Sequence, residues 1–173
     1  MREARSILEP YGVEVVQMAE EKLEVQSDSL EEIARVAAES VSRREVLFFV
    51  EDAGLFIPAL NGFPGPFSSY VYRTIGIKGV LKLMEGVTDR RAFFRSVVAL
   101  NVPGDGIKTF AGEVRGVIAT EARGHGGFGF DPVFVPEGYT ETFAEMPPAM
   151  KNRVSHRARA LRRMIKWLLE RGV

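Results

Sequence analysis

The chain has 173 residues, 46% of them hydrophobic and 27% charged, which is enough to bury one core and falls within the size of a single domain spanning 1–173. Its 23 basic and 23 acidic residues balance, so no overall charge draws it toward nucleic acid or an anionic membrane, and we expect neither as a partner. The sequence has no cysteine, which excludes disulfide bonds, a thiol nucleophile and a cysteine-ligated metal, but not a hard cation held by oxygen ligands.

The hydropathy pattern bears on where the protein resides. No run approaches the roughly 20 consecutive apolar residues that a membrane-spanning helix needs. Residues 1–5 lack the apolar core of a signal peptide. We therefore expect a soluble cytoplasmic protein.

The first 43 residues predict two helices separated by a strand. Residues 2–9 favour a short helix that ends before Gly12, and the β-branched content of residues 13–16 favours a strand. Ser29 then begins a capping-box pattern. Apolar residues recur at helical spacing after it, which predicts an amphipathic helix over 30–43.

A continuous apolar run at 46–50 is followed by Glu51 and Asp52. Such a run, bounded by charge on both sides, is typical of a strand covered on both faces, as in a central parallel sheet. Carboxylates at a strand end, followed by Gly54, are well placed to reach a metal from a rigid support. The alternative is an ordinary solvated boundary between strand and loop.

The middle of the chain predicts a broken helix and a hairpin. After the turn-rich residues 61–66, Ser68 and Ser69 are candidates to cap a helix that breaks near Gly76 and resumes over 80–84. Two strand-like stretches, 92–102 and 108–120, are joined by a Pro-Gly-Asp-Gly turn at 103–106.

The last third predicts a short strand at 133–135 and a C-terminal helix over the last 20 residues, apolar on one side and rich in Arg on the other. Helices alternate with a buried strand early in the chain, and a hairpin lies in the middle. We therefore predict an α/β fold with a mixed, strongly twisted sheet.

A glycine-rich segment at 124–132 combines a backbone that is free to approach a ligand with two aromatic rings and a carboxylate. A purine needs a stacking surface and a polar partner at its edge, and stacking contributes roughly 1–3 kcal/mol per base. Phe128 or Phe130 would supply the ring and Asp131 the carboxylate. The alternative is a glycine loop whose two rings complete the core.

Three further candidates, Lys151, His156 and Arg157, lie near the start of the C-terminal helix. Free backbone amides at a helix start already favour anions, and cationic side chains would add to this effect. The alternative is a solvated basic helix end.

Five motifs occur in one order over nearly the whole chain: Glu51–Leu55, Ala59–Gly65 with Tyr70, Gly127–Phe134, Thr142–Met146 and Ser155–Leu161. Together they resemble the inosine-triphosphate pyrophosphatases, which hydrolyse non-canonical purine nucleoside triphosphates. The resemblance implies a twisted mixed central sheet flanked by helices, two lobes around a cleft, and a homodimer. It also implies water attack on the α-phosphorus of the inosine, deoxyinosine or xanthosine triphosphate, assisted by Mg²⁺, with release of pyrophosphate.

The resemblance also implies a role for each motif residue. Asp52 would be the catalytic proton acceptor and a metal ligand, and Glu24 the second metal-side carboxylate. The substrate-binding set would be Ala53, Phe128, Gly129, Phe130, Asp131, Lys151, His156 and Arg157. The family has Ser where this chain has Ala53, which lacks the hydroxyl.

The family also has a first strand and a Ser/Thr-x-Asn-x-x-Lys loop before a helix that resembles residues 2–8. This sequence opens inside that helix. We expect it to fold through the remaining sheet but to hydrolyse nucleotide poorly, because the loop supplies a phosphate-contacting Asn and Lys.

Two alternatives stay open at this stage. One is a Maf-like nucleotide pyrophosphatase, against which the Ser155–Arg157 segment argues. The other is a catalytically impaired nucleotide-binding protein, which the missing loop and Ala53 would explain.

Overall fold

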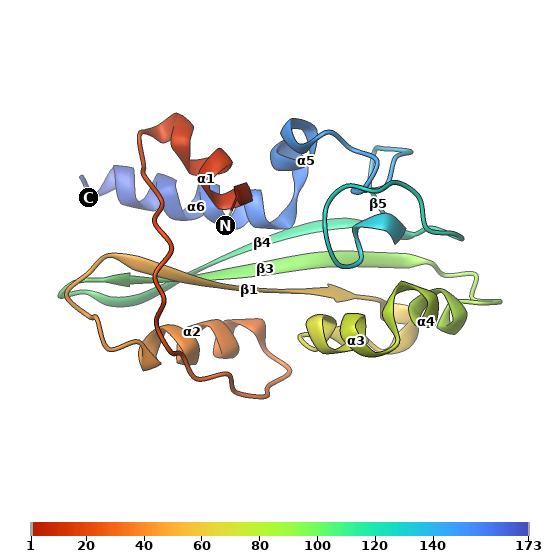
Figure 1. The fold of residues 1–173 in the computed structure, drawn as a ribbon, viewed down its shortest axis with the longest axis horizontal. Helices are drawn as coiled ribbons and strands as arrows, with labels where there is room; N and C mark the ends of the chain where they lie inside the picture. Colours follow the sequence, from red (N-terminus) through yellow and green to blue (C-terminus); the bar gives the residue numbers. More distant parts are fainter. Residues whose placement is uncertain (1, 173) are drawn as a thin grey trace. The chain divides into compact units, whose positions relative to one another are not determined.

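The computed structural model describes residues 2–172, and Figure 1 shows its helices and strands. The helices are α1 (Arg2–Leu8), α2 (Leu30–Ser40), α3 (Ser68–Thr74), α4 (Gly76–Leu83), α5 (Pro148–Val154) and α6 (His156–Glu170). The strands are β1 (Phe48–Phe56), β2 (Pro64–Gly65), β3 (Arg91–Val102), β4 (Gly106–Ile118) and β5 (Phe134–Pro136).

The strands form a sheet in the order β2-β1-β3-β4-β5. The predicted α/β class, with a central sheet flanked by helices, is confirmed. The sheet is antiparallel, however, where the sequence predicted a mixed one. The apolar run at 46–50 is only partly covered: Phe48 is buried, Phe49 and Val50 are half-buried, and Val46 and Leu47 are exposed and precede β1.

The chain divides into two compact units. Unit 1 comprises Met1–Ala53, Ser96–Glu113 and Ser155–Val173, and unit 2 comprises Gly54–Arg95 and Val114–Val154. Strands β1, β3 and β4 each contribute one part to each unit. The cleft expected from the family resemblance stays a prediction.

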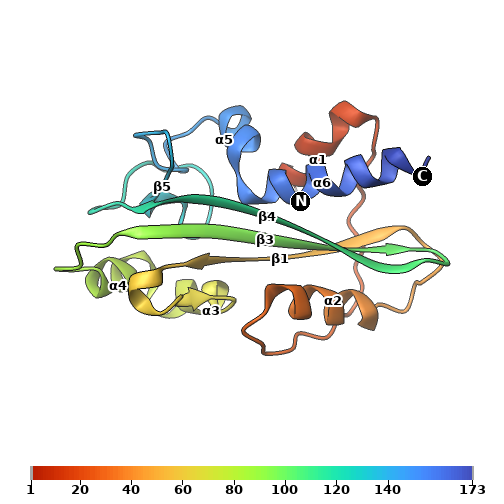
Figure 2. The same cartoon turned by 180° about the vertical axis from the view of Figure 1, so that it is seen from behind.

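In unit 1, α1 and α6 lie on one face of the strands and α2 on the other (Figures 1 and 2). The core between α1, α6 and β3 consists of aliphatic side chains such as Leu8, Leu100 and Leu161. The packing fixes the start of α6 against α1, and with it the polar side chains that these helices carry.

In unit 2, α3 and α4 lie on one face of the strands and α5 on the other (Figure 2). Its core contains a group of aromatic rings: the ring centroids of Phe94 and Phe134 are 4.8 Å apart, and those of Phe134 and Phe143 are 5.2 Å apart. Edge-on and tilted ring pairs of this kind add stability beyond the area they bury.

The structure confirms most elements that were predicted in the first half of the chain. Helix α1 is followed by a turn of 3-10 helix that Gly12 ends with a left-handed backbone, and the Ser29 hydroxyl caps α2 by accepting from the Glu32 amide at 3.2 Å. The strand predicted at 13–16 is wrong. This segment has no ladder partner, and the Val15 carbonyl accepts instead from the Arg5 side chain at 2.9 Å.

Two predictions in the middle of the chain need correction. Glu51 and Asp52 do not follow a strand but lie inside β1, which continues to Phe56. Ser68 does not cap α3: its hydroxyl donates to the Gly65 carbonyl at 2.7 Å and accepts from the Leu55 amide at 2.8 Å, joining β1 to the turn.

The remaining predictions agree with the structure. The helix break at Gly76 separates α3 from α4, and the hairpin turn joins β3 to β4 with a bond from the Asp105 amide to the Val102 carbonyl. The short strand is β5, and the C-terminal helix is α6, preceded by α5.

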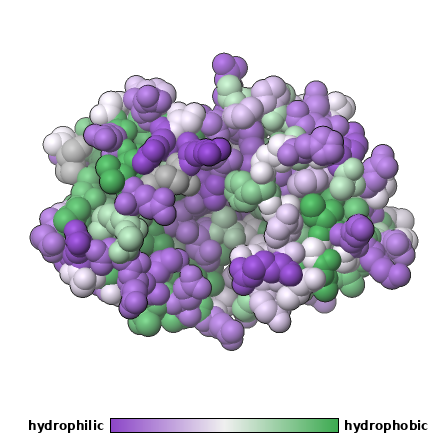
Figure 3. All heavy atoms as spheres, viewed as in Figure 1, coloured by the Kyte–Doolittle hydropathy of each residue, from purple (hydrophilic) through white to green (hydrophobic). Residues whose placement is uncertain are grey.

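No helix within residues 2–172 is both long enough and apolar enough to cross a membrane. On the face drawn in Figure 3, hydrophobic residues form small groups surrounded by hydrophilic ones.

Candidate functional site

The adjacent acids on β1 serve different faces of the sheet, because successive side chains of a strand point to opposite sides. Glu51 points toward the α6 face, where it meets Arg157. Asp52 therefore points to the other face, where its charged neighbours include Lys22 and Glu24. The pair is thus not one bidentate acidic site but two separate carboxylates.

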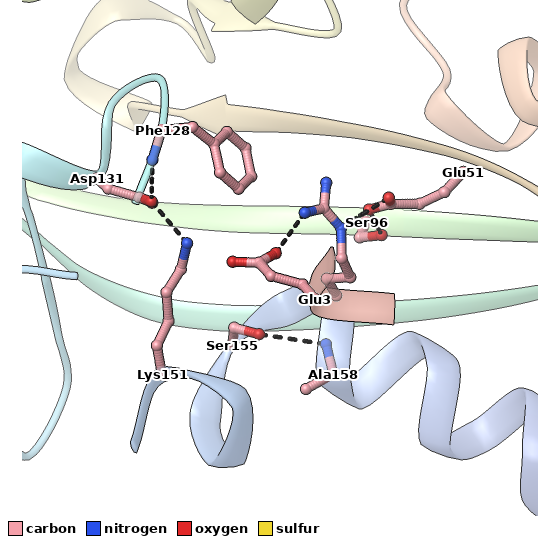
Figure 4. A network of polar contacts seen from close by, with 9 residues as sticks. Glu3, Glu51, Ser96, Phe128, Asp131, Lys151, Ser155 and Ala158 are labelled. Carbon is pink, nitrogen blue, oxygen red and sulfur yellow. Dashed lines mark hydrogen bonds and ion pairs between the residues drawn. The ribbon is translucent and has the colours of Figure 1, made fainter. Parts of the chain in front are cut away.

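Arg157 is the centre of a polar cluster in unit 1 whose members Glu3, Glu51 and Ser96 are labelled in Figure 4. Its Nε donates to both Glu51 oxygens, at 2.8 and 2.7 Å, and its Nη1 donates to Glu3 of α1. The Ser96 hydroxyl of β3 donates to Glu51 at 2.7 Å. Burial alone would lower the Arg157 pKa, but Glu51 and Glu3 raise it above its ordinary value, so the guanidinium stays charged.

The surroundings of the Asp52 carboxyl group perturb its pKa. Burial raises its pKa above the ordinary value, and the negative charges of Glu51 and Glu24 add to the rise. The Ala53 backbone amide and Lys22 oppose it. A carboxylate that is partly desolvated and close to other acids favours a bound cation.

Glu24 lies near Asp52 on the segment that precedes α2. Its carboxylate is 3.6 Å from the Lys22 ammonium, and its side chain is 80% exposed. Within residues 2–172, no group of three or more acidic or histidine side chains is assembled in metal-binding geometry. Two carboxylates suffice for Mg²⁺, which keeps several waters and takes its other ligands from substrate phosphates.

The start of α6 is placed by a cap and by a close approach to β4. The Ser155 hydroxyl accepts from the Ala158 amide at 3.2 Å, as Figure 4 shows. A Cβ atom on Gly112 of β4 would lie 2.2 Å from the His156 carbonyl oxygen, so only glycine lets the helix approach this closely. His156 is buried in the first turn, directly before Arg157.

In unit 2, Asp131 and Lys151 form a buried ion pair. The Lys151 Nζ lies 2.6 Å from Asp131 Oδ2, and the two residues are 4% and 1% exposed respectively. The same carboxylate oxygen accepts from the Phe128 backbone amide at 2.8 Å (Figure 4). The Lys151 ammonium also lies 4.5 Å from the centre of the Phe128 ring. One acid thus holds the lysine and the loop that carries Phe128.

The two rings of the glycine-rich segment have different surroundings. Phe128 is 52% exposed, whereas Phe130 is 2% exposed and packs edge-on against Tyr72 at 5.6 Å. Gly127 has a φ of +72°, and a Cβ atom there would lie 2.0 Å from Asp131 Oδ2. Gly129 also has positive φ, at +58°. The loop conformation therefore exposes the Phe128 ring to solvent and buries the Phe130 ring.

Comparison with known proteins places these residues in a family. The model of the Ham1 family matches residues 1–167 of the chain. The chain belongs to the Ham1 family.

Relatives in this family are similar over almost their whole length. A protein of Thermococcus kodakarensis named dITP/XTP pyrophosphatase is 52% identical over 172 residues, which cover 98% of this chain and 92% of that protein. One of the same name from Pyrobaculum aerophilum is 51% identical over 174 residues, covering 100% and 92%. The solved structure of a HAM1 protein from Coxiella burnetii superposes with a TM-score of 0.84, at 31% identity, over 98% of this chain and 92% of that one.

The structure of this Ham1-family chain brings several of the predicted residues into three groups. Phe128, Asp131 and Lys151 are in contact in unit 2. In unit 1, Asp52 lies near Glu24, and Arg157 is bound to Glu51.

Sequence reasoning missed the role of Glu51 and omitted Glu3 and Ser96 altogether. Glu3 is 154 residues from Arg157, so no local spacing could have paired them. The available signal was the balance of buried charge, since an arginine inside a fold needs carboxylate partners.

Proposed function

We propose that this Ham1-family protein hydrolyses non-canonical purine nucleoside triphosphates (ITP, dITP and XTP) to the monophosphate and pyrophosphate, and so removes them from the nucleotide pool. The observation that carries the proposal is the match, at 51–52% identity over nearly the whole chain, to proteins named dITP/XTP pyrophosphatase. The presence of the predicted base-binding and acidic residues in ordered clusters supports it.

The carboxylate partners of Lys151 and of Arg157 favour a neutral acceptor, such as a purine carbonyl, over a phosphate at each cation. Lys151 is paired with Asp131, and Arg157 with Glu51 and Glu3. A phosphate would meet carboxylates in both places. A neutral purine carbonyl would still accept a hydrogen bond from either cation, and a site that offers donors disfavours adenine, whose amino group cannot accept them.

Asp52 and Glu24 are the side chains we assign to Mg²⁺. The cation would neutralise the phosphate charge and activate the attacking water, and Asp52 would position that water or take its proton. The raised pKa of Asp52 supports this assignment, because burial and nearby acids disfavour its charged form when no cation is bound.

Removal of metal should therefore stop turnover. With excess chelator, we expect release of pyrophosphate from ITP to fall to background, and added Mg²⁺ in excess of the chelator to restore it. Continuous measurement of pyrophosphate would follow both steps. Full activity in chelator would contradict the assignment of a metal to Asp52 and Glu24.

We assign base stacking to Phe128, because its ring is half exposed while Phe130 belongs to the core. Phe128→Ala should raise KM for ITP by about five- to a hundredfold, which corresponds to the loss of roughly 1–3 kcal/mol of stacking. Phe67→Ala, which truncates another exposed ring of unit 2, is the matched control and should leave KM unchanged. Equal KM in the wild type and Phe128→Ala would remove Phe128 from the site.

A nucleotide panel tests the proposal against its alternatives. We expect kcat/KM to be high for ITP, dITP and XTP and low for ATP and the pyrimidine triphosphates. A preference for other nucleotides would favour the Maf-like alternative. Binding of ITP without any release of pyrophosphate would identify a catalytically impaired nucleotide-binding protein.

We further propose that the protein is a homodimer and acts in the cytoplasm, where nucleotide pools are maintained. The homodimer rests on the resemblance of its motifs to the family, and the cytoplasmic location on the hydropathy pattern of the sequence. Light scattering coupled to size-exclusion chromatography would give the mass of the particle, and twice 19.2 kDa is the expected value.

A further inference from the structure

We infer that Thr142 is a positioning residue: its hydroxyl, and the turn that it begins, hold in place the glycine-rich loop that carries Phe128. This inference rests on the proposed function, deepens its stacking assignment and concerns unit 2 alone. The turn at 142–145 belongs to one of the five motifs that carry the family resemblance, yet none of its residues is among the predicted site residues.

The turn at 142–145 is closed by two reciprocal hydrogen bonds. The Thr142 hydroxyl accepts from the Glu145 amide at 3.3 Å, and the Glu145 carboxylate accepts from the Thr142 amide at 2.8 Å. This is the bonding pattern of a capping box, which here closes a single turn. The Glu145 amide also donates to the Thr142 carbonyl at 3.0 Å. The turn is therefore fixed by two of its own side chains.

Thr142 also joins this turn to Arg123, which begins the glycine-rich loop. Its hydroxyl donates to the Arg123 carbonyl at 2.9 Å, and the residue is 0% exposed. A hydroxyl has one proton and two lone pairs, so it can donate to the loop and accept from the turn at once. The Glu145 carboxylate adds a contact at 3.8 Å with the Arg123 Nε. The start of the loop is thus held through both backbone and side chain.

Ala144, in the middle of the turn, holds the rest of the loop. Its carbonyl accepts from the Gly126 amide at 3.0 Å, and its amide donates to the Asp131 carbonyl at 3.3 Å. A Cβ atom on Gly124 would lie 2.5 Å from the Ala144 carbonyl carbon, so only glycine lets the loop lie this close to the turn. Phe128 lies between these attachments, and its amide donates to the Asp131 carboxylate. The conformation of the turn therefore determines the path of the segment that carries the ring.

The position of the Phe128 ring matters because a ring contributes stacking only while its face lies against the base. The residue is 52% exposed, so the backbone of the loop has a large part in setting where the ring lies. A ring that is already held in its binding position loses less conformational entropy when the base binds. The proposed proton acceptor, Asp52, belongs to the other unit. Loss of the Thr142 hydroxyl should therefore weaken substrate binding and leave the chemical step unchanged.

The test compares kcat and KM for ITP in Thr142→Val, Thr142→Ser and the wild type. Val has nearly the shape of Thr but lacks the hydroxyl, and we expect KM to rise roughly two- to tenfold with kcat unchanged, the scale of one lost hydrogen bond. Ser keeps the hydroxyl and should restore the wild-type KM. Thr140→Val, which removes an exposed hydroxyl that binds Glu141, is the matched control and should keep the wild-type KM.

A double variant separates positioning of the ring from a general loss of structure. In the Phe128→Ala background, Thr142→Val should raise KM no further, because the ring whose position it sets is already gone. Glu145→Ala removes the other half of the reciprocal pair and should give the same two results, so it replaces Thr142→Val if that variant does not fold. Melting temperatures identify the folded variants.

The inference is overturned if the folded variants of Thr142 and Glu145 keep the wild-type KM, lower kcat alone, or raise KM equally with and without the Phe128 ring. Failure of the proposed function is distinguishable. In that case the wild type itself would not hydrolyse ITP, or Phe128→Ala alone would leave KM unchanged, and the inference would fall with it.

Discussion

Asp52→Asn is expected to lower the release of pyrophosphate from ITP by about 10²–10⁴-fold, the contribution that a positioned proton acceptor usually makes. The substitution keeps the shape of the side chain but removes its charge and its basicity. The proposed Mg²⁺ would lose a charged ligand, and the attacking water would lose its proton acceptor. The measurement is steady-state kinetics at saturating Mg²⁺, with kcat as the parameter that should change most.

The same variant should keep its fold or gain stability. The Asp52 pKa is raised in the folded protein, so the folded state holds the carboxyl proton more tightly than the unfolded chain does. The ionised carboxylate is therefore a cost to folding at neutral pH, and this cost appears as pH rises above the unfolded pKa. Asn carries no charge, so in metal-free buffer the melting temperature should be unchanged or higher.

Asp105→Asn makes the same change at an exposed acid of the hairpin turn and serves as the control for both measurements. It should leave kcat unaltered. If Asp52→Asn retains the activity of this control, Asp52 is not the proton acceptor.

Lys151→Met is expected to destabilise the protein by about 3–5 kcal/mol, the usual cost of removing one partner from a buried ion pair. Met fills a similar volume, so the effect comes from charge and not from a cavity. The Asp131 carboxylate would lose the ammonium that neutralises it at 2.6 Å in a nearly water-free environment. Chemical denaturation followed by circular dichroism gives the free energy of unfolding.

Two further variants test the cause of this loss. Adding Asp131→Asn to Lys151→Met removes the second charge and should recover much of the stability, because no buried charge remains. Lys166→Met removes a lysine that is exposed on α6, and it should change the free energy of unfolding by less than about 0.5 kcal/mol. Equal effects of Lys151→Met and Lys166→Met would show that the Asp131–Lys151 pair contributes nothing to the fold.

The elements that the sequence predicted well are those with local signals. The cap at Ser29, the glycine at position 76 and the hairpin turn before Gly106 each act through neighbouring backbone, so their positions follow from the residues nearby. The strand expected at 13–16 failed because β-branched residues only favour an extended backbone. A strand also needs a partner, and local sequence does not supply one.

In the candidate site, too, local contacts could be predicted from the sequence and contacts between distant segments could not. Phe128 and Asp131 are three residues apart, and their connection is a feature of one loop. The assignment of Phe130 to the core depends instead on Tyr72, and the pairing of Arg157 depends on Glu3 and Glu51. Contacts between distant segments decide which ring is exposed and which cation is neutralised, and no periodicity along the chain encodes them.

Hydrolysis of dITP in water enriched in heavy oxygen tests the central claim most directly, because it reports the substrate, the products and the phosphorus that is attacked. If water attacks the α-phosphorus, the heavy oxygen appears in deoxyinosine monophosphate and not in pyrophosphate, and the two products form in equal amounts. Mass spectrometry of the reaction mixture distinguishes them. Label in pyrophosphate, a diphosphate with free phosphate as the products, or the absence of hydrolysis would contradict the account.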